Sequence, residues 1–181
     1  MTALMAGALM QPPCNRRVTA MSWNRHVTAA VSLMAGASNG STPIVDQILG
    51  AGANVNLRNS DGVTALMHAA VLGHLEVVEQ LLSRGADLSA TDNDGFDALV
   101  AAATGGSAAV SQLLLGKGLN VNVMAGSGGA PLMIAARAGA AECVEVLLAA
   151  GAHVDATAAP SAAFVAEITA LQAMAHRVTT V

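Results

Sequence analysis

The chain has 181 residues and a formal net charge of −4; 54% of its residues are hydrophobic, 11% are charged and 2% are aromatic. This balance excludes a disordered polar segment, two cysteines cannot form a disulfide scaffold, and an acidic chain lacks the basic patch usual in nucleic-acid-binding modules. A core this poor in aromatic residues must consist of Ala, Leu, Val and Met, which suits helices that pack closely.

Residues 1–27 are predicted to be a degenerate N-terminal segment. Residues 2–8 have the pattern of a repeat start but lie out of register with the rest, and Pro12-Pro13 would break a second helix there. Three arginines also precede the first acidic residue, Asp46, which is typical of an organelle transit peptide. The segment is therefore interpreted as an eroded repeat or, alternatively, as a transit peptide.

Two series of glycines then recur every 33 residues. The first series is Gly40, Gly73, Gly106 and Gly139, and the second is Gly52, Gly85, Gly118 and Gly151. Columns of Leu, Ala and Val keep the same register. This periodicity predicts four units, at residues 28–60, 61–93, 94–126 and 127–159, that must stack on one another to bury their apolar faces.

Each unit is predicted to form two short antiparallel helices followed by a turn. In the second unit, Thr64 can cap the first helix by accepting a free backbone N–H. Gly73 ends that helix, and the apolar stripe from Val77 to Leu82 marks the second helix, which Gly85 ends. The segment Asp92–Gly95 is predicted to be a tight turn.

Residues 160–181 are interpreted as a truncated C-terminal repeat. Residues 169–175 look like the start of another unit, but they arrive late, after a linker-like stretch that contains Pro160. Neither end of the chain has an obvious polar cap, which a stack of repeats needs for solubility. We therefore expect the chain either to be a fragment of a longer protein or to carry two poor caps, with the ends least ordered.

The segment from Asp61 to Asp87, with the sequence DGVTALMHAAVLGHLEVVEQLLSRGAD, closely resembles the ankyrin repeat. The resemblance extends over all four units. It implies an all-α, ankyrin-repeat solenoid of helix-turn-helix units, with β-hairpin or loop fingers on one side. The family has no shared catalytic residues and binds other proteins. The resemblance therefore implies a protein–protein interaction module, an adaptor or scaffold, and neither an enzyme nor a cofactor-binding protein.

The units depart from the Thr-Pro-Leu-His motif of the family. Thr is kept only at Thr64 and Pro only at Pro131, and the His position holds Met or Val in every unit. The Asn or Asp that closes each unit is Ser89 in the second one. These changes predict fewer local hydrogen bonds than in a typical repeat.

Several features that could suggest other functions are explained by the repeat. The uncharged stretches 98–116 and 118–136 fall in register with the units, so no membrane span is predicted. Gly126–Gly129 lacks the Lys of a phosphate-binding loop and is interpreted as a flexible finger. No metal site is expected: His74 is interpreted as structural and Cys143 as a small buried hydrophobic residue.

The acidic residues of the second helices are predicted to form a solvated edge, not a pair of carboxylates around a substrate. Glu76 and Glu79 lie one helical turn apart, and Glu142 and Glu145 fall at equivalent positions. The methionines at positions 34, 67 and 133 are predicted to face the core.

Ankyrin repeats usually bind through their fingers and the exposed part of the first helix. Carried over position by position, this implies a binding surface made of Ser38, Asn39, Arg58, Ser60, Asp61, Val63, Val71, Leu72, Thr91, Asn93, Asp94, Phe96, Thr104, Met124, Ser127, Arg137 and Ala138. Phe96 is either an aromatic hot spot or a residue that packs on its own finger. Arg58 and Arg137 are candidate anchors for an acidic partner, and the interface is expected to be largely apolar.

Two further hypotheses remain beside the adaptor. The chain can be a regulatory ankyrin segment of a larger enzyme or channel, or the product of a decaying repeat gene with no binding function. We expect a protein partner, with no nucleic-acid or membrane partner, and a monomer unless exposed end repeats pair. The expected location is the cytoplasm or the nucleus.

Overall fold

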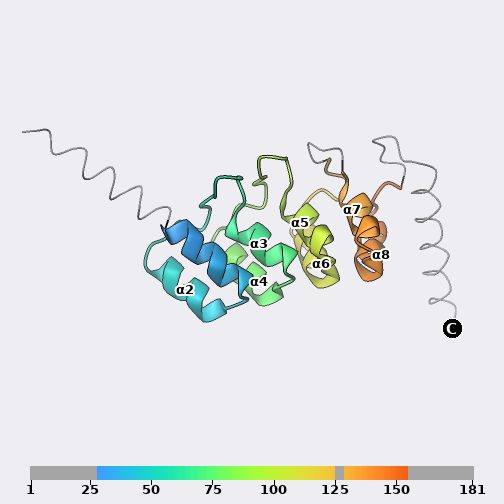
Figure 1. Ribbon diagram of the computed structural model, residues 1–181. Coiled ribbons are helices and arrows are strands. Elements are labelled where there is room, and N and C mark those ends of the chain that lie inside the picture. Colours follow the sequence, from blue (N-terminus) through green and yellow to red (C-terminus); the bar gives the residue numbers. More distant parts are fainter. Residues whose placement is uncertain (1–27, 125–128, 155–181) are drawn as a thin grey trace, which may run out of the picture.

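The computed structural model describes residues 28–124 and 129–154, and it shows a row of helix pairs (Figure 1). A helix over residues 28–38 precedes seven labelled helices: α2 (Thr42–Gly50), α3 (Ala65–Val71), α4 (Leu75–Ser83), α5 (Ala98–Gly105), α6 (Ala108–Gly116), α7 (Pro131–Arg137) and α8 (Ala141–Ala149). The predicted all-α fold of stacked helix pairs is confirmed. The interpretations of residues 1–27 and 160–181 lie outside the described residues.

The pairs repeat with the period of the sequence. The helices α3, α5 and α7 begin at Ala65, Ala98 and Pro131, which are 33 residues apart. These three helices pack against one another in one row, and α2, α4, α6 and α8 pack in a second row. The loops before α3 and α5 project from one edge of the stack (Figure 1). We call the surface made by these loops, residues 28–38, α3, α5 and α7 the inner face.

Local signals in the sequence set the ends of the helices. Thr64 caps α3, because its Oγ1 accepts the backbone N–H of Met67 at 3.3 Å. Asp97 replaces Thr at the equivalent place and caps α5 in the same way, accepting from Val100. Gly73 follows α3 with φ of 74°, the left-handed conformation that favours glycine. All eight glycines of the two series share this conformation.

The core is built from the predicted columns of small and aliphatic residues. The leucines at positions 33, 66, 99 and 132 are buried, as are the alanines at positions 37, 70 and 103. The methionines at positions 34 and 67 face this core as predicted, whereas Met133 is only half-buried. Ile44 is 45% exposed although its equivalents in later units are buried. Ile44 lies in the first helix pair that the structure describes.

The inner helices α3 and α5 approach each other closely at a glycine. A Cβ atom placed on Gly105 would lie 1.7 Å from the carbonyl oxygen of Val71. Only hydrogen fits there, because van der Waals contact between carbon and oxygen requires roughly 3 Å or more. Gly105 therefore sets how closely the second and third units stack.

In the part of the chain that the structure describes, no helix has the length and apolarity needed to cross a membrane. The uncharged stretch 98–116 forms the separate helices α5 and α6, with Gly106 in the left-handed conformation between them.

Asparagine side chains connect consecutive units beside the second helices. Asn56 donates from Nδ2 to the carbonyl of Gly85 at 3.2 Å, and its Oδ1 accepts the N–H of Asp87 at 2.8 Å. Asn122 makes the same two bonds to the fourth unit. Ser89 occupies this position in the second unit, and it bonds to Asp87 of its own unit instead. The joint between the second and third units thus lacks a connection that the other two joints have.

Replacing Ser89 with Asn is expected to raise the free energy of unfolding by about 1 kcal/mol. The longer amide can reach the carbonyl of Gly118 and the N–H of Asn120, the equivalents of the groups that Asn56 contacts. Urea unfolding of the full chain, followed by circular dichroism, measures the change. The matched control, Asn56→Ser, is expected to lower stability by a similar amount. No gain in Ser89→Asn would contradict the cross-link interpretation.

Candidate functional site

The loops before α3 and α5, residues 56–64 and 89–97, form two similar fingers. In the second finger, Asp92 Oδ1 accepts the N–H groups of Asp94 and Phe96 at 2.9 and 2.8 Å. Asn59 makes the equivalent pair of bonds in the first finger. Gly95 has φ of 81° and closes the predicted turn at residues 92–95, which is confirmed. These side-chain bonds hold both finger tips in a defined shape.

Arg58 is exposed, but its guanidinium is committed to the fingers. Its Nε donates to the carbonyl of Gly62 at 3.0 Å, and its terminal nitrogen donates to the carbonyl of Thr91 in the next finger. The backbone of Arg58 also pairs with Thr64 in an isolated antiparallel bridge. Arg58 thus connects two units through its Nε and one terminal nitrogen, and its role as an anchor for an acidic partner stays a prediction.

Asn93 makes the second connection between the two fingers. Its backbone N–H donates to the carbonyl of Asp61 at 2.9 Å, and its Nδ2 donates to the carbonyl of Ser60 at 3.0 Å. The predicted contact residues at the finger tips therefore also have a structural role. The carboxylate of Asp61 remains exposed to solvent.

A hollow of about 410 Å3 lies on the inner face, between the second finger and the helices α3, α5 and α7. Three consecutive units contribute to it. Six of its lining residues belong to the binding surface predicted from the sequence: Val63, Val71, Asp94, Phe96, Thr104 and Arg137. The structure thus brings together about one third of the predicted set in one concave place.

The hollow has six further lining residues that the sequence reasoning did not include: Met67, His68, Asp92, Asp97, Ala101 and Ile134. Met67, Ala101 and Ile134 are more than nine-tenths buried, which confirms the predicted core position of Met67. Their remaining exposed edges form the floor of the hollow.

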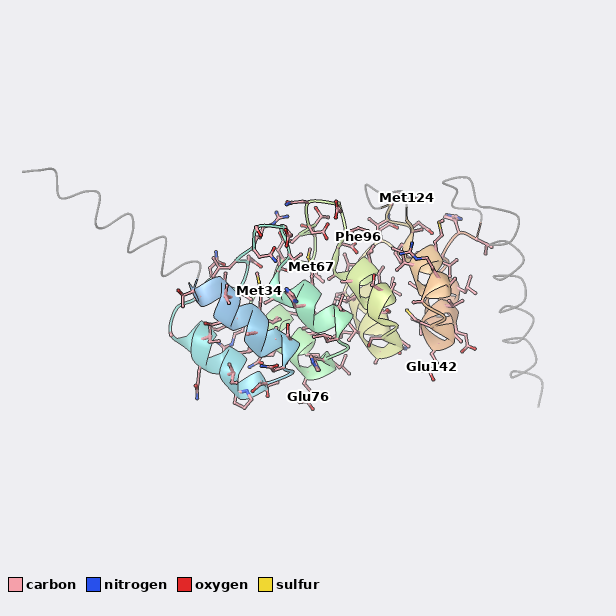
Figure 2. All side chains as sticks on the ribbon, viewed as in Figure 1. Met34, Met67, Glu76, Phe96, Met124 and Glu142 are labelled. Atoms are coloured by element: carbon pink, nitrogen blue, oxygen red, sulfur yellow. The ribbon has the colours of Figure 1, made fainter. Side chains whose placement is uncertain are left out.

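Phe96 combines the two roles considered for it. Its side chain is half-buried and packs against the core, and it also lines the hollow. Figure 2 shows Phe96 and Met67 on the finger side of the stack, whereas Glu76 and Glu142 lie at the opposite edge. Both glutamates are exposed, as predicted for a solvated acidic edge.

The remaining predicted residues lie outside the hollow. Leu72 and Met124 are half-exposed, and Asn39 and Ala138 are exposed, while Ser127 lies outside the described residues. Ser38 belongs to a joint between units, because its carbonyl accepts a hydrogen bond from His74 Nε2 at 2.8 Å. This bond confirms that His74 has a structural role.

The charges around the hollow are unequal. Three carboxylates, of Asp92, Asp94 and Asp97, face one guanidinium, that of Arg137, with His68 also in the lining. Asp94 and Arg137 are exposed, and within residues 28–124 and 129–154 neither side chain makes a hydrogen bond or ion pair. The hollow is therefore a partly apolar surface with an acidic wall.

Asp97 is the buried member of that wall, with 4% of its surface exposed. Burial raises the pKa of its carboxyl above the ordinary value, and the backbone N–H groups of Val100 and Leu99 oppose this shift in part. The charged form is thus less favourable in the folded protein than in the unfolded chain.

Replacing Asp97 with Asn is expected to stabilise the protein at neutral pH, because Asn caps a helix equally well without a buried charge. Since the folded pKa is raised, the contribution of the carboxyl is fully present below its unfolded pKa, and it is lost as the pH rises through the folded pKa. The advantage of Asp97→Asn should therefore shrink as the pH falls toward about 3. Urea unfolding of both proteins from neutral pH down to about pH 3 measures this difference in stability.

The matched control is Asp97→Ala, which removes the cap together with the charge. It is expected to be less stable than Asp97→Asn by about 1 kcal/mol at every pH. A stability difference between Asp97→Asn and the wild type that does not change with pH would contradict the raised pKa.

Cys143 is fully buried in α8, as predicted for a small hydrophobic residue. Its Sγ lies 3.3 Å from the hydroxyl of Ser111, which is also buried. Burial raises the pKa of the Cys143 thiol. A buried thiol of raised pKa is a poor nucleophile, so this pair belongs to the packing between α6 and α8.

Comparison with known protein families identifies the repeat units of the stack. The family model described as ankyrin repeats (3 copies) matches residues 33–125 and, in a second register, residues 86–158. A search of curated proteins finds no significant match. Ankyrin repeats are typically protein-interaction modules and are usually non-catalytic. The matched residues cover more than half of the chain and coincide with the stacked helix pairs, so the chain belongs to the ankyrin repeat family.

Proposed function

We propose that this chain is a protein–protein interaction module, an adaptor or scaffold, that binds its partner on the inner face. The observation that carries the proposal is the hollow of about 410 Å3, to which three consecutive units contribute side chains. Binding pockets typically have volumes of roughly 300–1,000 Å3. The hollow can therefore hold an anchoring side chain of a partner, while the exposed residues around it provide the rest of the interface.

The stiffness of the fingers supports this proposal. The side-chain bonds of Asn59 and Asp92 shape the two finger tips, and Arg58 and Asn93 connect them. A surface that is already ordered loses less conformational entropy on binding than a mobile loop does. We also propose the unit boundaries 28–60, 61–93, 94–126 and 127–159, which the spacing of equivalent helices supports.

The test compares two variants of the full chain as baits for partner proteins. Val71→Lys places a long side chain in the hollow, because Val71 lines it and is 37% exposed. Gln47→Lys makes the same change in charge on α2, where Gln47 is exposed and is not one of the residues that line the hollow. Bound proteins are identified by quantitative mass spectrometry, after circular dichroism has confirmed that both variants fold.

We expect a set of proteins that wild type and Gln47→Lys retain and that Val71→Lys loses by more than about tenfold, as for the loss of a hot spot. Equal retention by Val71→Lys and Gln47→Lys would contradict binding at the hollow. We further propose the cytoplasm or the nucleus as the location, since the free thiol of Cys143 suits a reducing compartment.

A second candidate is a regulatory ankyrin segment within a larger enzyme or channel. The apolar side chains of Val31 and Ile44, exposed on the first helix pair, support it because they offer a surface on which another element can pack. Sequencing of the full-length transcript tests this candidate. A transcript that encodes no further domain would contradict it.

A further inference from the structure

We propose that the hollow takes a basic, apolar segment of the partner: a short stretch in which a Lys or Arg stands beside an apolar side chain. This inference rests on the proposed function, because it names the chemistry of the segment that the inner face binds. It goes beyond the largely apolar interface expected from the sequence, and it replaces the expected acidic partner with a basic one.

The floor of the hollow accounts for the apolar part of the segment. Met67, Ala101 and Ile134 show their exposed edges there, and Phe96 contributes part of its ring. An aliphatic side chain that enters the hollow removes apolar surface of both partners from water, which is the main favourable contribution to protein association. The hollow has too little volume for more than a few side chains, so the contact is with a segment and not with a broad surface.

The acidic wall accounts for the basic part of the segment. Asp92 and Asp94 of the second finger and Asp97, the N-cap of α5, belong to one short stretch of the chain, and all three line the hollow. Asp94 is the accessible member, because it is exposed and its carboxylate has no partner within the described ranges. A cation of the bound segment can therefore pair with Asp94 without breaking an existing bond.

The positive charges of the protein do not balance this wall. Arg58, the other candidate anchor, donates to the carbonyls of Gly62 and Thr91. Arg137 is then the single guanidinium in the lining, against three carboxylates. Charge in a concave, partly apolar site acts more strongly than on a flat surface. An acidic segment would meet net repulsion here, and a basic segment would meet net attraction.

The repeat itself supplies a matched control for the charge. Asp61 occupies the position of Asp94 in the preceding finger, and it is also exposed, but it does not line the hollow. Asp61→Lys and Asp94→Lys thus change the net charge equally at equivalent places in the fold. A difference in peptide affinity between the two variants therefore measures the effect of charge at the hollow and not of the overall charge of the chain.

The experiment selects random linear peptides, displayed on phage, against the folded full chain. We expect enrichment of peptides with Lys or Arg next to Leu, Ile, Met or Phe. The most enriched peptide is then synthesised, and its affinity for each variant is measured by isothermal titration calorimetry. Asp94→Lys is expected to weaken binding about tenfold, the isosteric Asp94→Asn less, and Asp61→Lys far less than either variant at Asp94. Arg137→Glu is expected to strengthen binding.

Three results would overturn the inference: enrichment of acidic peptides, enrichment of apolar peptides without a basic residue, or equal losses in Asp94→Lys and Asp61→Lys. A selection that enriches no peptide family overturns it as well. The proposed function is judged separately by Val71→Lys and Gln47→Lys. If Val71→Lys loses the captured proteins while charge reversal at Asp94 has no effect, the interaction module stands and only its preference for a basic segment fails.

Discussion

Replacing Gly105 with Ala is expected to lower the free energy of unfolding by about 2–3 kcal/mol, and the measurement is urea unfolding of the full chain. The added methyl group would lie 1.7 Å from the carbonyl oxygen of Val71, so α3 and α5 must move apart. Gly105 is the last residue of α5 and has no left-handed backbone conformation. The cost is therefore steric and arises between units, not from the backbone conformation of the residue.

Gly116→Ala is the matched control, because Gly116 is the last residue of α6 and a Cβ there meets no atom within 4 Å. That variant is expected to gain about 0.5–1 kcal/mol, since Ala restricts the unfolded chain and favours the helix. A loss of stability in Gly105→Ala together with a gain in Gly116→Ala would confirm the close approach of α3 and α5. A gain in Gly105→Ala would show that the two helices are not in contact there.

Replacing Leu99 with Ala is expected to cost about 2–5 kcal/mol, the range for removing a fully buried leucine side chain. Leu99 is completely buried in α5, which packs against α3 on one side and α7 on the other, and against α6 of its own pair. In a stack of repeats, stability depends on the contacts between neighbouring units. The variant should therefore weaken both joints of the third unit at once and reduce the cooperativity of urea unfolding.

The same chemical change at an exposed position provides the control. Leu72 follows α3 and is 50% exposed, so Leu72→Ala is expected to cost less than about 1 kcal/mol. Equal unfolding midpoints for Leu99→Ala and Leu72→Ala would contradict the burial of Leu99 at the centre of the stack. A loss of stability in Leu99→Ala without any change in the slope of the transition would instead show that the stack unfolds as a single unit.

The periodic part of the fold could be predicted from residues alone, because it depends on local physics. Gly73 and its equivalents at the 33-residue period mark left-handed helix ends, and Thr64 marks a helix start. The spacing of leucines reports which side of each helix is buried. These signals act within one unit, and repeating them four times makes the stacked architecture the arrangement that buries every apolar stripe.

The degree of burial of individual core positions could not be predicted in the same way. Ile44 has the residue type of a core position, yet it is 45% exposed among the described residues, in the first helix pair that the structure describes. Met133 shares its column with the buried Met67, and it is only half-buried. Burial depends on which residues are neighbours in space, and the residue type at a position does not specify those neighbours.

The candidate site depended most on the stacked arrangement. From the sequence, Arg58 and Arg137 are both candidate anchors for a partner. In the stacked structure, the guanidinium of Arg58 donates to the carbonyl of Thr91, whereas Arg137 lines the hollow. Met67 is core, as predicted, and Asp97 is the N-cap of α5, but stacking also places an edge of each at the hollow. The contact of Gly105 with Val71 sets the distance between α3 and α5. That distance decides which residues of neighbouring units meet at the hollow.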